Sequence, residues 1–523
     1  MKTRVLLLRP RYSTLISPFS AYGLLTIGSI IKKMAHTDVK IIDNNSLYKF
    51  YSDDDLFQII EEYNPEIVGI NINIMNAYNS YDFINQLKQK FPSVMILAGG
   101  IHSYNNAKEI ALKSACDVVI KGEADITIQK LIKQFQMDKK SDFSNITGLI
   151  INGHDTGPTE LLTDLDQLPF IDYSIYNLDD FVKYKQDHHF ITNVVINQRG
   201  CPYTCTFCSA DFLHSRYRRH SPQYVAKHIE HLYSQNSYHS FFIADNNFTL
   251  NTQWAMEVCQ EIKRRGLNKL INFEFQTNIK CNFSDALLKE LYGAGFRRIE
   301  FGIERLTDDG MKSVHKYVPY EEIVERLEKI RYAQYPFELF TNILLGFSFD
   351  TLDSLKRELT LFTSVKSYFD AIGVKFLAPI PGTKEYSSNI HLKGVREWYL
   401  QDSFTKLKTS FFQMAMFDYT GAYFLNYFNL DRKILREMIA IQIHFINHTI
   451  RSTNQWLIIP RYFELILVFL SLILFRISPS IENFVFYPVV KLRFFLMKWI
   501  YAKLFNEMEQ EIFCSKELKG HLE

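Results

Sequence analysis

The chain reads TNVVINQRGCPYTCTFCSADF from Thr192 to Phe212. This stretch places Cys201, Cys205 and Cys208 in a Cys-x3-Cys-x2-Cys spacing, directly after a β-branched run typical of a buried strand. Three thiolates this close together suit one soft metal centre. A closed structural zinc site needs four ligands, and no fourth cysteine lies nearby in the sequence. Three thiolates on a four-iron, four-sulfur cluster would leave one iron open for another ligand, which indicates chemistry rather than storage.

This segment, with Arg199-Gly200 before it and Phe207 within it, resembles the cluster loop of radical S-adenosylmethionine (SAM) enzymes. The resemblance implies that the open iron binds the amino and carboxylate groups of SAM. It also implies that the reduced cluster cleaves SAM to a 5'-deoxyadenosyl radical, with electrons from an external donor such as flavodoxin or ferredoxin. The alternative is a structural zinc knuckle or a buried apolar group of cysteines.

Composition and length set broad limits on the protein. The chain has 523 residues, enough for two or three domains, and its apolar content of 47% excludes a disordered chain. The formal net charge is only +2, so no global field indicates nucleic acid as a partner. The four cysteines outside the cluster loop are scattered singly, which is typical of a reducing compartment, and the N-terminal apolar run is too short for a signal peptide. We therefore expect a cytoplasmic protein.

The first 152 residues alternate short β-branched runs with helical patterns, which predicts a doubly wound parallel sheet of Rossmann-like type. Ligands of such sheets bind beyond the carboxyl ends of the strands. The predicted strands are Val5 to Leu8, Val39 to Ile42, Ile67 to Ile72, Val94 to Ala98 and Val118 to Ile120.

Strand ends in this region carry Gly99, Gly100, His102, Gly122 and Glu123, and glycines there let a backbone approach a bulky ligand. Together with the strand pattern, these residues resemble the cobalamin-binding domain of one large radical SAM subgroup, which makes them candidate cofactor contacts. The Asp-x-His-x-x-Gly motif that supplies a histidine to cobalt elsewhere is absent from the sequence, so the resemblance implies cobalamin bound without a protein histidine. Two alternatives stay open: His102 as an ordinary loop hydrogen-bonder, and a vestigial domain without cobalamin.

Residues 153–190, rich in glycine, proline and aspartate, are predicted to form a linker. Alternation then resumes over 191–385. Six βα units are two short of a closed eightfold barrel, so we expect an open, partial (β/α)6 barrel of the TIM type whose strand ends line the active site. The predicted strands are Val194 to Asn197, Phe241 to Ala244, Asn272 to Gln276, Arg298 to Gly302, Leu339 to Leu345 and Gly373 to Leu377.

Candidate site residues stand at the ends of these strands: Asp245, Gln276, Gly302, Glu304 and Gly346. In the resembled subgroup the Gly-Ile-Glu stretch and the glycine after the fifth strand help hold SAM, and the match implies these roles for Gly302, Glu304 and Gly346. For Glu304 and Asp245 the alternative is a carboxylate that only caps a helix. No residue is assigned a catalytic role toward the substrate.

Residues 386–523 are expected to be mainly helical. The run at 462–475 is too short to span a bilayer, and the segment 484–505 mixes aromatic with basic residues. This mixture favours a helix that lies at a membrane surface and attaches the protein there peripherally. A helical subdomain packed against the barrel, or against a second copy, is an equal alternative.

These features predict a radical SAM enzyme that uses a four-iron, four-sulfur cluster and cobalamin, and the leading reaction is methylation of an unactivated carbon in a small-molecule or lipid-like substrate. A cobalamin-dependent radical cyclase or rearrangement enzyme is the alternative within the subgroup. A non-catalytic cobalamin or iron-sulfur sensor is the alternative from another class. Methylthiolation of RNA is set aside because the region before the cluster loop has only one cysteine, Cys116.

Overall fold

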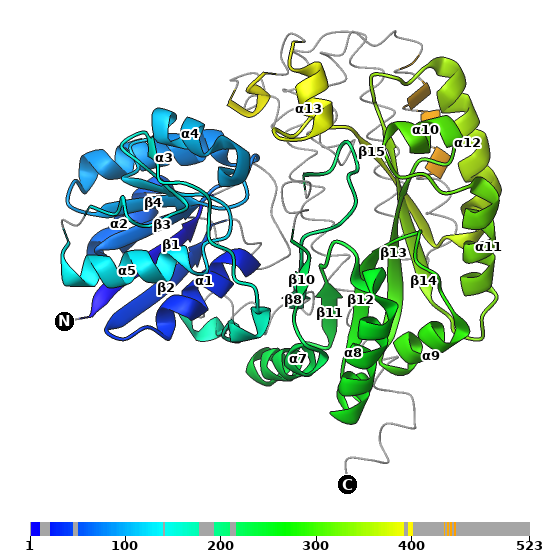
Figure 1. The fold of residues 1–523 in the computed structure, drawn as a ribbon, viewed down its shortest axis with the longest axis horizontal. Helices are drawn as coiled ribbons and strands as arrows, with labels where there is room; N and C mark the ends of the chain where they lie inside the picture. Colours follow the sequence, from blue (N-terminus) through cyan, green and yellow to red (C-terminus); the bar gives the residue numbers. More distant parts are fainter. Residues whose placement is uncertain are drawn as a thin grey trace.

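We examined a computed structural model of the chain. The structure describes residues 2–10, 21–44, 51–139, 142–176, 193–209, 216–391 and 396–400, with single helical positions between 434 and 445. Two lobes lie side by side, each built on its own sheet (Figure 1). The predicted α/β fold class is therefore confirmed.

The N-terminal lobe contains a seven-stranded sheet with the strand order β2-β1-β3-β4-β5-β6-β7. The five strands from β1 to β5 pair in parallel, in the order of a doubly wound sheet, as the sequence predicts. The strands are β1 (Thr3–Arg9), β2 (Thr37–Asp43), β3 (Ile67–Asn71), β4 (Met95–Gly99), β5 (Val118–Ile120), β6 (Leu149–Ile151) and β7 (His154–Asp155). The helices are α1 (Tyr22–Lys32), α2 (Asp53–Tyr63), α3 (Ala77–Lys90), α4 (Ser103–Lys113) and α5 (Thr127–Met137).

Helices cover both faces of this sheet, which explains its unbroken apolar strands. Alternate residues of β1 point to opposite faces: Val5 and Leu7 pack with α1 and α5, whereas Leu6 and Leu8 pack with α2 and α3. The apolar cluster on the α1 side continues without a break into the second lobe. The two lobes therefore share one core.

Two strands at one edge differ from the all-parallel expectation. β6 pairs antiparallel with β5, and β7 pairs antiparallel with β6. Asn152 and Gly153 turn the chain between β6 and β7, with φ angles of 50° and 77°. An Asn-Gly pair between two short strands is a strong signal for a hairpin, and Gly153, the first residue of the predicted linker, lies in this turn.

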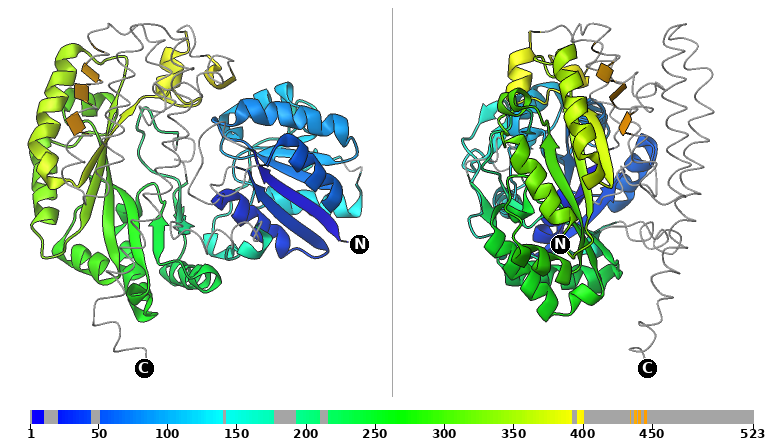
Figure 2. Two further views of the ribbon diagram at one scale, coloured as in Figure 1. Left: turned by 180° about the vertical axis from the view of Figure 1, so that it is seen from behind. Right: turned by 90° about the vertical axis from the view of Figure 1, so that its right-hand side faces the viewer.

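The second lobe contains a six-stranded parallel sheet with the order β15-β14-β13-β12-β11-β8, so consecutive strands are neighbours and the sheet stays open between its first and last strand. Helices follow its outer side (Figures 1 and 2). The strands are β8 (Asn193–Val195), β11 (Ser240–Ile243), β12 (Asn272–Asn278), β13 (Phe296–Glu304), β14 (Glu338–Leu345) and β15 (Ala371–Phe376). The helices are α7 (Pro222–Asn236), α8 (Thr252–Arg264), α9 (Asp285–Gly293), α10 (Asp308–Ser313), α11 (Tyr320–Arg331), α12 (Leu352–Val365) and α13 (Lys384–Asn389).

The alternation of residues along the strands of this sheet determines which side chains face the site. In β13 the buried residues Ile299, Phe301 and Ile303 belong to the apolar core, while the residues between them, among them Glu300 and Glu304, stay accessible from inside the sheet. A period of two is what a strand with one core face requires. The polar strand residues are therefore collected on the inner face.

The segment after the barrel returns to the N-terminal lobe. Tyr399 is buried in the core of that lobe, and its hydroxyl donates to Glu109 Oε2 at 2.7 Å. Lys113 of α4 and Glu397 form an ion pair at 2.8 Å. The two lobes are thus connected both at the cysteine loop side and at this segment.

The C-terminal prediction falls mostly outside the described residues. Met438, Ile441 and Phe445 lie on helical positions and pack into the core of the second lobe. The segments 462–475 and 484–505, predicted to attach the protein to a membrane surface, lie beyond the described part of the chain. Among the residues that the structure describes, no helix has the length and apolar character that a bilayer crossing would need.

Candidate functional site

The three loop cysteines line one cavity of about 240 Å³ at the carboxyl ends of β12, β13 and β14. We call it the cysteine cavity. Each of the three thiols is only partly buried, and Cys208 N–H donates to Cys205 O at 3.1 Å. Thr206 ties the loop to the barrel because its hydroxyl donates to Glu385 Oε1 at 2.8 Å. The loop is thus held in place beside the open space.

The donor set fits an iron-sulfur cluster. Burial raises the pKa of Cys201 and of Cys205, and the nearby Lys316 ammonium opposes that rise. Bound iron would supply the positive charge that thiolates need here. No three metal-binding side chains in the described residues converge on one point, as a single zinc ion would require. A four-iron cluster offers a separate iron to each thiolate and does not need that convergence.

No further cysteine among the described residues lines the cysteine cavity. Cys281 follows β12 and is partly buried, and burial raises its pKa to about 11. The cavity therefore offers three thiolates and leaves one corner of a cluster for a ligand from outside the protein.

Glu304 lies in the cysteine cavity in an unusual backbone conformation. Its φ angle is 66°, and the pairing of β13 with β14 shifts register just before it. A left-handed non-glycine residue at a bulge is strained, and such strain is found at functional sites. Its Oε1 lies 3.1 Å from Lys316 Nζ, and both side chains are largely buried. The cavity thus presents one carboxylate and one ammonium side by side.

Gly302 makes this pairing sterically feasible. A Cβ atom at that position would lie 2.6 Å from Lys316 Nζ and 3.1 Å from Glu304 Oε1. Any other residue would force the ammonium of Lys316 to shift. The Gly-Ile-Glu stretch that the sequence singled out is therefore a matched unit, completed by a lysine from outside it.

Amide side chains form most of the remaining polar wall. Glu300 Oε1 accepts from Asn342 Nδ2 at 2.9 Å, and Glu300 Oε2 accepts from Gln276 Nε2 at 3.3 Å. Phe207 also lines the cavity and contacts Phe347 in a T-shaped arrangement with ring centroids 6.1 Å apart. The structure thus brings Phe207, Gln276 and Glu304 together around the cysteines.

Gly346 supports the site from outside the cavity. Its φ angle is 93°, and its N–H donates to Asp350 Oδ2 at 2.8 Å. Asp350 is itself held by the fully buried Arg305 at 2.5 Å. The turn after β14 is therefore fixed by a buried ion pair, and Gly346 does not line the cysteine cavity.

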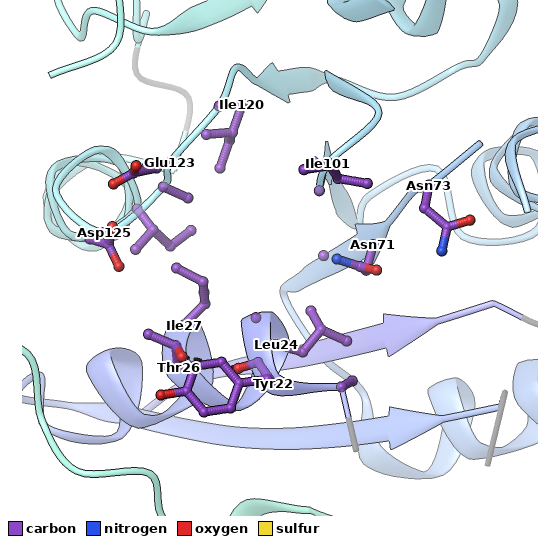
Figure 3. A pocket seen from close by; sticks show the side chains of 18 of the residues that line it. Tyr22, Leu24, Thr26, Ile27, Asn71, Asn73, Ile101, Ile120, Glu123 and Asp125 are labelled. Atoms are coloured by element: carbon purple, nitrogen blue, oxygen red, sulfur yellow. Dashed lines mark hydrogen bonds between the residues drawn. The ribbon is translucent and has the colours of Figure 1, made fainter. Parts of the chain in front are cut away.

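A second, larger cavity of about 540 Å³ lies at the carboxyl ends of the N-terminal sheet and reaches the second lobe. We call it the interlobe cavity. Figure 3 shows Tyr22, Leu24 and Ile27 of α1 on one side of it and Ile101 and Ile120 on others. Its walls are largely apolar, with polar groups at the rim, which is the character of a pocket for a bulky organic cofactor.

Glycines form the part of the wall that follows β4 and β5. Gly99, Gly100 and Gly122 all line the interlobe cavity, so backbone rather than side chains faces the space there. No histidine is among the described residues of the wall. These walls fit a corrin ring.

His102 lies elsewhere. Its side chain is buried and lines neither cavity. Its Nε2 contacts the Tyr81 hydroxyl at 3.1 Å, and its ring packs edge-on against Tyr399 at 5.1 Å. The position matches the alternative of a loop hydrogen-bonder, so its expected role as a cofactor contact has no geometric support.

Glu123 is engaged by two arginines of the second lobe. Its Oε2 lies 2.7 Å from Arg199 Nη1, and its Oε1 lies 2.5 Å from Arg218 Nη2. Arg199 also pairs with Asp125 at 2.5 Å. Burial alone would lower the pKa of Arg199, but hydrogen bonds and attraction from Asp125 and Glu123 outweigh this and raise it. Glu123 lines the interlobe cavity, but its carboxylate serves an ion pair between the lobes.

Asp245 and Asn246 follow β11 and have different environments. Asp245 is fully buried, lines neither cavity and accepts the N–H groups of Asn197 and Gln198 at 2.6 and 3.0 Å. Burial raises the pKa of Asp245 to about 7, although those hydrogen bonds oppose the rise. Asn246 is exposed and lines both cavities. Asp245 therefore shapes the chain before the cysteine loop, and Asn246 borders the space between the two sites.

Sequence reasoning missed Lys316 and the partners of Arg199. Lys316 lies in a loop beyond Glu304 with no motif around it, and only the fold brings its ammonium to the cavity. Arg199 was noted before Cys201, but its carboxylate partners lie 74 and 76 residues away.

Two family models match the chain. Residues 15–132 match the model described as "B12 binding domain", and residues 195–359 match the model described as "Radical SAM superfamily". The first match covers most of the N-terminal lobe with the glycine wall. The second covers the cysteine loop, Glu304 and Lys316.

Curated relatives and solved structures agree with these matches. An uncharacterized methyltransferase of Pyrococcus horikoshii is 26% identical over 72% of this chain and 80% of its own length. The anaerobic magnesium-protoporphyrin IX monomethyl ester cyclase of Cereibacter sphaeroides is 24% identical over 62% of this chain, which spans about half of that protein, 53%. The structure of the radical SAM methyltransferase TsrM from Kitasatospora setae, with tryptophan and a SAM analogue bound, superposes with a TM-score of 0.60. That match has 17% identity and covers 72% of this chain and 73% of TsrM.

Proposed function

Because the chain belongs to the radical SAM enzymes that carry a B12-binding domain, we propose that it methylates an unactivated carbon of a small-molecule or lipid-like substrate. Its cofactors are a four-iron, four-sulfur cluster, SAM and cobalamin. When bound, these groups supply a carbon-centred radical and a methyl group. The protein's own residues bind, orient and shield them.

At the cysteine cavity we assign three roles. Cys201, Cys205 and Cys208 would each hold one iron. Lys316 and Glu304 would face the oppositely charged carboxylate and ammonium groups of SAM, since a buried charged ligand requires charged partners. The Phe207 ring, packed on Phe347, would keep water from this end of the cavity.

At the interlobe cavity the backbone at Gly99, Gly100 and Gly122 would lie against the corrin ring, and the aliphatic side chains of α1 would cover its other face. No histidine is among the described residues that line this cavity. We therefore propose cobalamin bound without a protein nitrogen on cobalt. Electron paramagnetic resonance of the cob(II)alamin form should show no superhyperfine splitting from a histidine nitrogen, and such splitting would refute this assignment.

One observation carries the proposal: the two cavities share a wall. Ile196, Gln198, Arg199 and Gly200 line the interlobe cavity, and the next residue, Cys201, lines the cysteine cavity. Asn246 borders both. A substrate at this wall would be close to both cofactor sites, which a reaction using a radical and a methyl donor on one carbon requires.

An isotope experiment tests the reaction even while the substrate is unidentified. Cells that express the wild-type protein are grown with methionine whose methyl group carries three deuterium atoms. The matched control expresses the variant with all three loop cysteines replaced by alanine. A product with a labelled methyl group on carbon should appear only with the wild-type protein. The purified enzyme should then form S-adenosylhomocysteine and 5'-deoxyadenosine in equal amounts, since one SAM yields the radical and another restores the methyl donor.

The similarity to a cyclase favours one alternative reaction, a radical cyclisation or rearrangement. If 5'-deoxyadenosine forms without S-adenosylhomocysteine and the product lacks a new methyl group, the reaction is a cyclisation or rearrangement. If neither compound forms under any reducing condition, the protein is a sensor.

Two further assignments concern partners. We propose an external electron donor of the flavodoxin or ferredoxin type, and a reversible attachment of the enzyme to membranes through residues 455–505. Apolar burial and anionic lipid both favour such attachment, so salt should weaken it. Flotation with anionic and neutral liposomes tests this, and absence of binding to either would favour a packed subdomain or an interface between two copies.

A further inference from the structure

The wall between the two cavities is fixed to the N-terminal lobe by four charged side chains. Glu123 and Asp125 lie in the turn after β5, while Arg199 and Arg218 belong to the antiparallel pair β9 (Gln198–Arg199) and β10 (Arg218–Arg219). We propose that this group, the interlobe clamp, positions the cluster loop and couples it to the occupancy of the interlobe cavity. This inference rests on the proposed function.

The four side chains of the clamp are joined by five hydrogen bonds. Asp125 binds Arg199 through two hydrogen bonds, at 2.5 and 3.1 Å, and Glu123 binds Arg218 through two, at 2.5 and 3.0 Å. A further bond of 2.7 Å joins Arg199 to Glu123 and links the two pairs. Two positive and two negative charges balance, and paired bonds of this kind fix direction as well as distance.

The clamp is buried, which makes it sensitive to the loss of any member. The exposed fractions of the four side chains are 8% for Glu123, 5% for Asp125, 19% for Arg199 and 9% for Arg218. Removing one partner leaves a buried charge without compensation. The loop that Arg199 begins would then lose its fixed position.

The position of the interlobe clamp explains how a ligand in the interlobe cavity would affect the cluster loop. Glu123, Asp125 and Arg199 line the interlobe cavity, so a ligand there packs directly against the clamp. Cys201 follows Arg199 after one residue, Gly200, whose φ angle is 84°. A group bound in one cavity therefore restrains the short segment that carries a cluster ligand in the other. Linkage requires the reverse effect on binding free energy, that of the bound cluster on the affinity of the interlobe cavity for its ligand, to be equally large.

The test measures iron release and needs no substrate. Reconstituted protein is mixed under argon with an iron chelator, with and without hydroxocobalamin. We expect hydroxocobalamin to slow iron release from the wild-type protein roughly tenfold, within the range typical of coupling between sites. In Asp125→Asn, which loses the charge but keeps the shape, the slowing should fall to about twofold or less. Arg199→Lys keeps the charge but loses the forked contact, so it should lie between the two.

The control is Glu397→Gln, at a more exposed ion pair with Lys113. It removes an ion pair that also joins the segment after the barrel to α4 but lines neither cavity. The slowing in this variant should equal that of the wild-type protein. The inference would be overturned if hydroxocobalamin slowed iron release as much in Asp125→Asn as in the wild-type protein. It would also be overturned if Asp125→Asn and Glu397→Gln lost this slowing to the same extent.

A reciprocal measurement avoids substitutions in the clamp altogether. Hydroxocobalamin should bind the iron-loaded protein roughly tenfold more tightly than the variant lacking the three loop cysteines. Equal affinities would overturn the coupling while leaving the proposed function intact. Absence of hydroxocobalamin binding to both forms would overturn the proposed function and this inference together.

Discussion

The two cavities meet at one wall but differ in the kind of surface they present. The interlobe cavity is walled by glycine backbone and aliphatic side chains, and its charged rim residues Glu123, Asp125 and Arg199 are occupied by one another. The cysteine cavity is walled by thiols, amides and the pair formed by Glu304 and Lys316. The first surface suits a large ligand held by shape, and the second suits a metal cluster and a small charged ligand held by direct bonds.

The difference implies that mutations should act differently in the two cavities. Changes in the cysteine cavity remove bonds to a ligand, so they should lower ligand affinity with little effect on folding. Changes in the interlobe cavity that alter a constrained backbone or a buried ion pair should change folding and binding together, whereas a side chain added at an unconstrained position of its wall should weaken binding alone. The following predictions test this contrast.

Replacing Cys201, Cys205 and Cys208 together by alanine should have the largest effect. Iron content should fall from about four atoms per chain to nearly none, and the charge-transfer absorption of the cluster should disappear. Iron analysis after anaerobic reconstitution measures this. The variant Cys116→Ala, which changes a cysteine outside both cavities, should retain its iron. Full iron in the triple variant, or one tightly bound zinc in the wild-type protein, contradicts the assignment.

Glu304→Gln should weaken SAM binding by about 1.5 to 3 kcal/mol, because a buried hydrogen bond to a charged group is lost. Equilibrium dialysis of SAM against the reconstituted protein measures the change. Glu300→Gln is the control in the same cavity, since Glu300 accepts from Gln276 and Asn342 and has no cationic partner among the described residues. Its effect should stay below about 1 kcal/mol. Equal losses in both variants would show that Glu304 has no specific role.

Gly100→Ala and Gly99→Ala should distinguish two effects in the interlobe cavity: a change in backbone conformation and a loss of contact with the ligand. Gly100 has a φ angle of 103°, and a Cβ atom there would lie 2.6 Å from Ile72 O, so alanine should destabilise the lobe by at least 1 to 2 kcal/mol, roughly the cost of the backbone conformation alone. A Cβ atom at Gly99 would lie 3.7 Å from its nearest neighbour, Ile120 O, an ordinary contact. Gly99→Ala should therefore fold normally but bind hydroxocobalamin more weakly. Thermal melting and titration of both variants measure this, and unchanged affinity in Gly99→Ala would place the ligand away from this wall.

Asp245→Asn should give the smallest effect, a change in the pH dependence of stability. Burial raises the pKa of Asp245 in the folded state to about 7, above its unfolded value of 3.8. The folded state therefore binds a proton more tightly, so this group's contribution to stability is largest below about pH 4 and is lost as the pH rises to about 7. The melting temperature of the iron-free variant should fall less between pH 4 and 7 than that of the iron-free wild-type protein. Parallel curves for the two proteins would mean that Asp245 is ionised throughout.

Much of the fold followed from local patterns. Strands and helices of both lobes were predicted from apolar runs and breakers, and the parallel pairing of β1 to β5 and of β8 with β11 to β15 followed from their alternation with helices. The edge hairpin of β6 and β7 was missed because its Asn-Gly turn was assigned to a linker. The predicted domain boundaries, and the roles of the SAM and cobalamin contacts, remain predictions.

The sequence by itself determined the groups that act over short distances. Cys201, Cys205 and Cys208 lie within one loop, and Gly302 and Glu304 lie two residues apart at the end of one predicted strand, so spacing alone places each group together.

Only the tertiary structure decided which distant groups meet. Lys316 reaches Glu304 from a loop beyond the strand, and Arg199 reaches Glu123 and Asp125 across two lobes. The same packing buried His102 against Tyr81 and away from the cavity that its sequence position had suggested. Such contacts depend on how helices and sheets pack, and packing is set by the whole apolar core rather than by residues near in the chain. The shared wall between the two cavities arises in this way, from the cysteine loop of one lobe lying against the strand ends of the other.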